Sequence, residues 1–202
     1  MSQIALPLRG GPGAGPARIV VGNANAAVFE ALRRPESWPF RTAVLTGPPR
    51  SGKSLIARWF AEQGAEAIDD ADALDETVLF HRWNRAQENG TPLLLVAGRE
   101  PWEIALPDLK SRLGAALQLQ LGTPDDEMVA ALIEAEAAQR GLVLAEGATI
   151  YLVPRCERSF AGIERLVAAI DRISLERKQP ATLSVWRDAL DSTLGSEQPR
   201  LL

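Results

Sequence analysis

The chain has 202 residues and a formal net charge of −4, and 46% of its residues are hydrophobic while 24% are charged. This balance is typical of one large or two small globular domains, and the negative charge argues against a general attraction to DNA or to an anionic membrane. The longest apolar runs have the length of a strand, too short to span a membrane. The single cysteine, Cys156, excludes an internal disulfide and fits a reducing compartment, so we expect a cytoplasmic protein.

Residues 1–17 have the composition of a flexible tail that contains a short apolar motif, Gln3-Ile4-Ala5-Leu6-Pro7-Leu8. Pro7 removes a backbone donor and favours an extended conformation of Leu6. Glycine and proline dominate the residues after the motif, as they do in linkers. We therefore expect no folded element to begin there, and a frayed terminus is the alternative to a short binding peptide.

From residue 18 to residue 122 the sequence alternates apolar strands with amphipathic helices. Residues 18–25 lead into a predicted helix at 26–34, and the alternation continues with strands at 42–46, 92–97 and 117–121, helices at 54–63 and 75–88, and a weak strand at 64–67. This pattern predicts a parallel sheet covered by helices. From residue 123 onward only helices are predicted, at 123–140, 146–153, 159–178 and 182–191. We therefore predict an α/β domain at 18–122 and a helical domain at 123–202.

The loop after the strand at 42–46 satisfies every fixed position of the phosphate-loop pattern G-x-x-x-x-G-K-[ST]. In such loops glycines let the backbone N–H groups curl around phosphates, and the following helix adds its positive end. Lys53 is expected to reach the β- and γ-phosphates, and Ser54 to supply an oxygen ligand to Mg²⁺. The predicted nucleotide-binding residues are Gly47, Pro48, Arg50, Ser51, Gly52, Lys53 and Ser54.

An acid pair, Asp69-Asp70, follows the weak strand at 64–67. In a phosphate-loop protein such a pair binds Mg²⁺, here through Asp69, and orients a water, here through Asp70. However, too few residues separate Ser54 from Asp69 to hold a helix, a full strand and a second helix. Either the sheet lacks a strand–helix unit, or the acid pair is a solvated turn.

In this order the motifs resemble the DnaA family of initiator-type AAA+ ATPases, and specifically its short Hda branch. Residues 21–25 resemble the family's nucleotide-proximal segment, Asp69-Asp70 its Walker B acids, and residues 79–84 the helix that follows. Residues 106–113 resemble the segment that carries the arginine finger, which falls on Arg112. The resemblance implies an AAA+ parallel sheet followed by an all-α lid, with ADP or ATP and Mg²⁺ bound, and with Val20 and Val21 near the nucleotide. It does not extend to the family's C-terminal DNA-binding domain, so we expect no direct sequence-specific DNA binding.

The apolar motif of the tail resembles the clamp-binding peptide Q-L-x-L-P-L of the Hda branch. The resemblance implies that Gln3, Ile4, Leu6, Pro7 and Leu8 bind the DNA polymerase III sliding clamp (beta subunit). It also implies a negative regulator of replication initiation that, docked on the clamp, stimulates hydrolysis of the ATP held by DnaA. In that mechanism Arg112 is supplied in trans to the γ-phosphate.

Three departures from the family pattern lead us to expect weak or no intrinsic ATPase activity. A strand–helix unit before Asp69 is missing, residues 96–99 offer no equally polar sensor except Arg99, and Ala161 stands where the lid carries its sensor arginine. Arg158 and Arg165, on the same helical face as Ala161, are candidates to replace that arginine. The alternatives are a stand-alone P-loop ATPase or kinase, and a non-catalytic DnaA-like adaptor. The sequence leaves self-association open.

Overall fold

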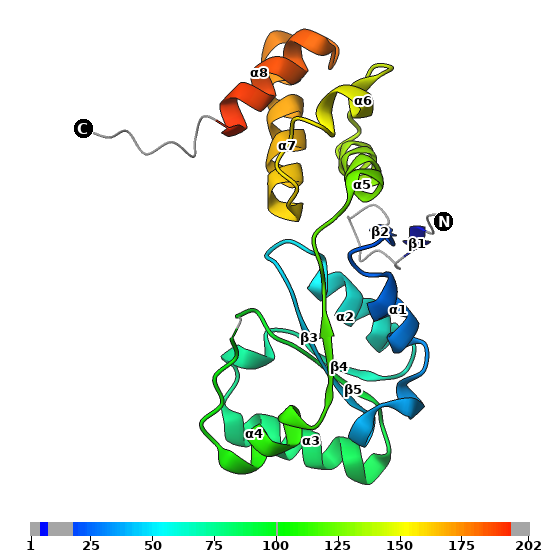
Figure 1. The fold of residues 1–202 in the computed structure, drawn as a ribbon, viewed down its shortest axis with the longest axis vertical. Coiled ribbons are helices and arrows are strands. Elements are labelled where there is room, and N and C mark those ends of the chain that lie inside the picture. The colour runs from blue at the N-terminus through cyan, green and yellow to red at the C-terminus, as the bar shows by residue number, and fades with distance from the viewer. Residues whose placement is uncertain (1–4, 8–17, 100, 195–202) are drawn as a thin grey trace, which may run out of the picture. The chain divides into compact units, whose positions relative to one another are not determined.

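The structure of the chain, a computed structural model, describes residues 5–7, 18–99 and 101–194 (Figure 1). The chain divides into two compact units. Residues 25–122 form an α/β unit, and the described residues before 25 and after 122 form a mainly helical unit. Within the described part, each helix is too short or too polar to cross a membrane.

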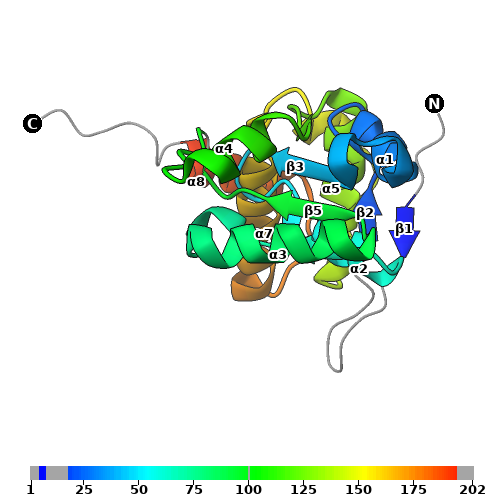
Figure 2. The same cartoon turned by 90° about the horizontal axis from the view of Figure 1, so that it is seen from below.

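The sheet of the α/β unit has four parallel strands in the order β4-β5-β3-β6. The strands are β3 (Thr42–Thr46), β4 (Glu66–Ile68), β5 (Leu93–Val96) and β6 (Leu117–Gln120). β3 lies inside the sheet, and β3 and β5 can be seen to run in the same direction in Figure 2. Because the carboxyl ends of parallel strands meet at one edge of the sheet, the segments that follow β3, β4 and β5 all emerge at that edge.

Four helices accompany the sheet: α1 (Ala26–Leu32), α2 (Lys53–Glu62), α3 (Glu76–Asn89) and α4 (Pro107–Gly114). Short 3₁₀ turns lie at 35–37, 39–41 and 71–73. Strand side chains alternate between the two faces of a sheet. Val44 and Leu95 share a buried cluster with residues of α3 and α4, whereas α2 packs on β4 and β5. All four residues of β5 are buried, as expected for a parallel strand covered on both faces.

The predicted fold is confirmed, including the small size of the sheet. The weak strand of the sequence analysis is β4, which follows α2 directly and pairs with β5. No further strand or helix separates α2 from β4 in this described stretch. The strand–helix unit is therefore missing, and Asp69-Asp70 lie in an exposed turn directly after a paired strand, so the role of the two acids stays a prediction.

The helical unit contains α5 (Asp126–Gln139), α6 (Ala148–Leu152), α7 (Phe160–Arg177) and α8 (Leu183–Leu194), with α7 packed against both α5 and α8 (Figure 1). The buried core between these helices includes Ile133, Ile170 and Trp186. The helix starts follow local capping rules. Asp125 accepts a hydrogen bond from the N–H of Met128, and Ser159 caps α7 in the same way.

Residues 18–24 fold with the helical unit, whereas the sequence analysis placed them in the domain at 18–122. The strand β2 (Arg18–Val20) contacts α5, and Ala24 packs against Met128. The side chain of Asn23 joins this segment to the start of α5. Its Nδ2 donates to the carbonyl oxygen of Thr123 at 3.0 Å, and its Oδ1 accepts from the N–H of Asp125 at 3.0 Å.

A short strand, β1 (Ala5–Pro7), pairs antiparallel with β2, with Leu6 opposite Ile19 (Figure 2). The prediction that no folded element begins in this region is therefore wrong for residues 5–7. The extended backbone that Pro7 favours is also the backbone of a strand, and proline is tolerated where a strand lies at an edge. The other motif residues, Gln3, Ile4 and Leu8, lie outside the described residues.

Candidate functional site

The phosphate loop connects β3 to α2 and has a curled backbone. Gly47 leaves the strand with a φ of +151°, and a Cβ there would lie 2.7 Å from the Cβ of Leu121. Arg50 and Gly52 also have positive φ values, 62° and 84°. Left-handed residues beside right-handed ones turn successive N–H groups toward one concave side, which forms an anion-binding site. The loop therefore has the backbone shape that phosphate binding requires.

The side chains of the loop fit a nucleotide phosphate. The Lys53 Nζ donates to the carbonyl oxygens of Gly47 at 2.7 Å and Pro48 at 2.9 Å, so the ammonium group lies against the loop. Ser51 is buried, and its Oγ has no hydrogen-bond partner in the described part of the chain. The N-terminus of α2 receives no side-chain cap from the described residues. Together with the exposed Ser54, these features match the loop's predicted ligand, an anion at a helix N-terminus.

The acid pair Asp69-Asp70 follows β4 at the same edge of the sheet as the phosphate loop, and both residues are exposed. The Asp69 Oδ1 accepts a hydrogen bond from the N–H of Asp70 at 3.1 Å. The described residues hold no cluster of three or more histidine, cysteine or acidic side chains that could bind a metal ion. The two acids can therefore serve a metal ion only together with other oxygen ligands, such as Ser54 and phosphate.

A third acid, Asp72, was not predicted. Its carboxylate accepts hydrogen bonds from the N–H groups of Gly98 at 2.7 Å and Arg99 at 3.0 Å. These bonds fasten the end of β5, the place where the family pattern has a polar sensor. Its position two residues after the acid pair was the signal available in the sequence.

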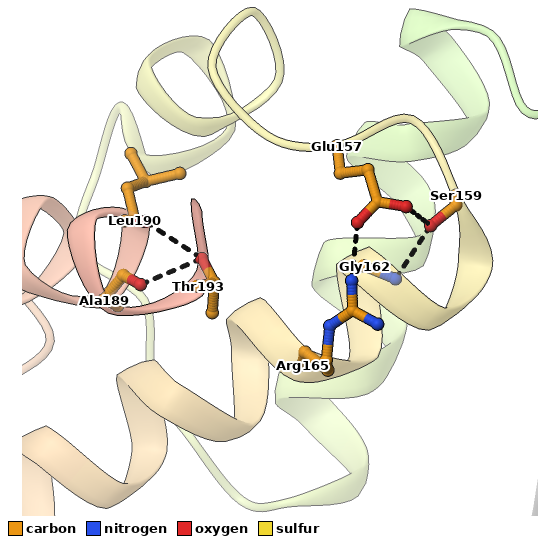
Figure 3. Close-up of polar contacts among 7 residues, drawn as sticks. All are labelled: Glu157, Ser159, Gly162, Arg165, Ala189, Leu190 and Thr193. Carbon is orange, nitrogen blue, oxygen red and sulfur yellow. Dashed lines mark hydrogen bonds and ion pairs between the residues drawn. The ribbon is translucent and has the colours of Figure 1, made fainter. Parts of the chain in front are cut away.

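The two arginines considered as replacements for the lid sensor are both held within the helical unit. Figure 3 shows Glu157 between the Ser159 hydroxyl and the Arg165 guanidinium, with a 2.6 Å contact to Arg165. Arg158 forms an ion pair with Asp126 at 2.7 Å. The roles proposed for Arg158 and Arg165 therefore stay predictions, and both side chains already have a carboxylate partner.

Val20 and Val21 lie in the helical unit, in β2 and directly after it. Val20 packs beside Ala24 and Met128 in a small apolar cluster. The next residue, Gly22, passes so close to α5 that a Cβ there would lie 2.9 Å from the Met128 side chain. The predicted nucleotide-proximal segment is thus built into the same packing unit as the first helix of the predicted lid.

Arg112 lies in the last turn of α4 and contacts α3 through uncharged groups. Its Cζ lies 4.5 Å from the ring centroid of Phe80 and 4.3 Å from that of Trp83. Its Nη1 donates to the Oδ1 of Asn84 in a short hydrogen bond. Sequence reasoning found Arg112 but missed these partners as functional residues. Their spacing of three and four residues, which places them on one helical face, was the available signal.

Comparison with known proteins matches the helical unit to a family model and most of the chain to a relative. Residues 125–190 match the family described as "Hda, lid domain". An uncharacterized protein of Haemophilus influenzae is 30% identical to this chain over 177 residues, which cover 84% of this chain and 71% of that protein.

Solved structures share the fold at low sequence identity. Domain III of the Thermotoga maritima replication initiation protein DnaA superposes with a TM-score of 0.66 and 17% identity, covering 87% of this chain and 94% of that one. A structure of the replication initiator DnaA bound to AMPPCP and single-stranded DNA gives a TM-score of 0.58 and 16% identity, covering 78% and 65% of the two chains. Both comparisons support an AAA+ fold.

Proposed function

The chain belongs to the Hda-like proteins, which are related to the replication initiator DnaA, and on this basis we propose that it stimulates hydrolysis of the ATP held by DnaA. In this proposal the protein is a negative regulator of replication initiation. It binds a nucleotide in its own phosphate loop, docks on the sliding clamp through its N-terminal motif, and offers Arg112 to the nucleotide of a DnaA subunit.

The observation that carries the proposal is the state of Arg112. Its guanidinium is half-buried and held by two aromatic rings and an amide, none of which is charged. A positioned guanidinium that retains its positive charge can stabilise the negative charge that develops on a transferring phosphoryl group. Arginine fingers supplied in trans are worth about 10³ to 10⁵ in rate.

The nucleotide bound in the phosphate loop of this chain has a different role in the proposal from the nucleotide held by DnaA. Gly47, Gly52 and Lys53 would hold the phosphates, and Ser54 with Asp69 would hold Mg²⁺. The chain offers no side-chain sensor at residues 96–98, and Ala161 cannot contact a phosphate through a polar group. We therefore expect bound ADP or ATP to act as a structural ligand with slow turnover, while Asp70 stays available to orient a water.

Thermal unfolding tests the nucleotide site. A ligand that binds only the folded state at a hundred times its Kd adds about 2.7 kcal/mol of stability. ADP with Mg²⁺ should therefore raise the melting temperature of the wild type and of Lys110→Ala, in which the exposed lysine of α4 is lost. It should have little effect on Lys53→Ala. An equal rise in Lys53→Ala would place the nucleotide elsewhere.

The clamp contact is proposed for Gln3, Ile4, Leu6, Pro7 and Leu8. The peptide would bind an apolar groove as an extended segment, which is compatible with the extended backbone of residues 5–7. Tethering to the clamp raises the effective concentration near DnaA. Replacing Leu6 and Leu8 by alanine should therefore abolish clamp binding and shift stimulation to higher protein concentrations.

The whole proposal is tested by following radiolabelled ATP on purified DnaA, with the clamp loaded on DNA. Wild type and Lys110→Ala should accelerate hydrolysis, whereas Arg112→Ala should not. Equal stimulation by all three would keep DnaA as the partner and remove Arg112 from the mechanism. No stimulation by wild type, with DnaA and clamp active in a control reaction, would contradict the proposed function and favour an adaptor or an independent ATPase.

A further inference from the structure

The strand that precedes the acid pair is short and lies at the edge of the sheet. β4 has three residues and, in the described part of the chain, pairs with β5 alone, with Ile68 opposite Leu95. On its other side β5 pairs with β3, and the N–H of Ala97 donates to the carbonyl oxygen of Leu45 at 3.0 Å. The end of β5 therefore lies between the acid pair that follows β4 and the phosphate loop that follows β3.

Asp72 ties the turn after β4 to the end of β5. Its Oδ1 accepts a hydrogen bond from the N–H of Gly98 at 2.7 Å, and its Oδ2 accepts one from the N–H of Arg99 at 3.0 Å. The turn is itself closed by a hydrogen bond, because the N–H of Ala73 donates to the carbonyl oxygen of Asp70 at 2.9 Å. The bonds of Asp72 to β5 therefore also hold Asp70 in place.

Asp70 and Asp72 face the same point on β5. A Cβ added to Gly98 would lie 3.4 Å from the Oδ1 of Asp70 and 3.5 Å from the Oδ1 of Asp72. Each carboxylate oxygen of Asp72 already accepts a backbone N–H, and such bonds to a charged group are stronger than those between neutral groups. Asp72 is therefore suited to support the acid pair rather than to join it as a metal ligand.

From this geometry we infer that Asp72 is a positioning residue for Asp69 and Asp70, which it holds at the edge of the sheet where the phosphate loop emerges. Its hydrogen bonds supply the support that an edge strand of three residues lacks on its outer side. Groups that orient metal ligands in this way affect metal affinity about tenfold to a hundredfold. The inference rests on the proposed nucleotide site, because it assigns a cause to the placement of the acids proposed to serve Mg²⁺.

Glu76 offers a matched comparison within the same segment. Its carboxylate also accepts from two successive N–H groups, those of Ala105 at 2.9 Å and Leu106 at 2.6 Å, and it is half-buried like that of Asp72. These bonds fasten the residues just before α4 instead of the end of β5. Asp72→Asn and Glu76→Gln each remove one negative charge and place an amide NH₂ group against a backbone N–H, so both should destabilise the fold. Only Asp72→Asn should loosen the acid pair.

The test measures the binding of ADP to the full chain by isothermal titration calorimetry, first in EDTA and then at increasing Mg²⁺ concentrations, at a temperature where each variant is folded. For Asp72→Asn we expect the Kd of Mg²⁺ in the ADP complex to rise about tenfold to a hundredfold. The Kd of ADP in EDTA should stay at the wild-type value, because the phosphate loop is unchanged. Glu76→Gln should keep both constants of the wild type.

A double substitution shows whether Asp72 acts through the acid pair. Adding Asp72→Asn to Asp69→Ala should raise the Kd of Mg²⁺ no further than Asp69→Ala alone, because the ligand that Asp72 positions is already lost. Two effects that simply add would show that Asp72 acts independently of Asp69 and would overturn the inference.

The outcomes separate this inference from the proposed nucleotide site. A wild-type Kd of Mg²⁺ in Asp72→Asn overturns the inference alone, and so does an equal rise in Glu76→Gln. If the wild type binds no ADP, or binds it no more tightly with Mg²⁺, the inference and the proposed site are both overturned. If Asp72→Asn does not fold, Asp72→Ser replaces it, since a hydroxyl still accepts one of the two N–H groups. The same rise is expected there, and a wild-type constant would overturn the inference.

Discussion

Replacing Arg112 by alanine should destabilise the α/β unit as well as abolish the proposed activity. The substitution removes cation–π contacts to Phe80 and Trp83, worth about 0.5–1 kcal/mol each at a partly exposed site. It also removes a hydrogen bond from a charged donor to Asn84, worth about 1.5 kcal/mol. Part of this sum is lost to residual contacts in the unfolded chain, so we expect a cost of about 2 kcal/mol.

For a chain of this size, about 2 kcal/mol lowers the melting temperature by about 4–8 °C. Thermal unfolding followed by circular dichroism measures this change directly. The control is Arg85→Ala, which removes an exposed arginine from α3, the helix that Arg112 contacts, and should change stability by less than about 0.5 kcal/mol. Arg112→Lys should fall between the two, because lysine keeps the charge and loses the planar group.

If Arg112→Ala melted together with Arg85→Ala, the contacts with Phe80, Trp83 and Asn84 would not hold the guanidinium. The size of the measured loss also sets the temperature for the hydrolysis assays, which must lie below the melting temperature of the least stable variant.

Three further predictions concern other parts of the chain. In Gly47→Ala the new Cβ would lie 2.7 Å from the Leu121 Cβ at a φ of +151°, so the variant should melt at a lower temperature than wild type and gain less melting temperature on adding ADP. Thermal unfolding with and without ADP measures both effects, and a wild-type response would contradict the prediction. The Asp75 carboxylate caps α3 by accepting hydrogen bonds from the N–H groups of Thr77 and Val78, so Asp75→Ala should lower the free energy of unfolding in urea by about 1 kcal/mol. Asp75→Asn should keep most of the wild-type stability, and equal stability of all three proteins would rule out the cap. Burial raises the pKa of the Cys156 thiol, so less of the reactive thiolate is present near pH 8 in the folded chain. Iodoacetamide should therefore label the folded chain more slowly than the urea-unfolded chain, and the labelling rate should rise as the pH approaches the raised pKa. Equal rates for the folded and unfolded chains would show that the thiol is not shielded.

The architecture was predictable because its signals are local. The run Leu93–Val96 is wholly apolar, as a parallel strand buried on both faces must be. The capping residues Asp75, Asp125 and Ser159 mark helix starts within one to three residues of the predicted positions. The small number of residues between Ser54 and Asp69 also indicated the missing strand–helix unit, because so short a segment cannot hold an additional strand and helix.

The features that sequence reasoning missed depend on contacts between distant segments. Asn23 binds Thr123 and Asp125, about a hundred residues later, and this contact helps to place residues 18–24 with the helical unit. Likewise, β1 exists through pairing with β2, because three extended residues are not stable alone. Neither pairing leaves a periodic pattern in the sequence.

The candidate site likewise combines a local motif, which could be predicted, with contacts between distant residues, which could not. The loop from Gly47 to Ser54 is a continuous motif, so its residues could be named in advance. The environment of Arg112 combines residues 28 positions apart in the case of Asn84, and only the packing of α4 on α3 brings them together. The resemblance to the DnaA family named Arg112 as the candidate finger, whereas its uncharged contacts could be recognised only in the structure.

The central claim is that this protein supplies Arg112 to a nucleotide held by DnaA. The most direct measurement is a competition, in which Arg112→Ala is titrated into a reaction where wild type stimulates hydrolysis of DnaA-bound ATP on clamp-loaded DNA. We predict that the variant inhibits the reaction, because it occupies the same contact on DnaA without providing the guanidinium. Stimulation by the variant at the wild-type rate would contradict the claim, as would a wild-type rate that stays unchanged at a large excess of the folded variant.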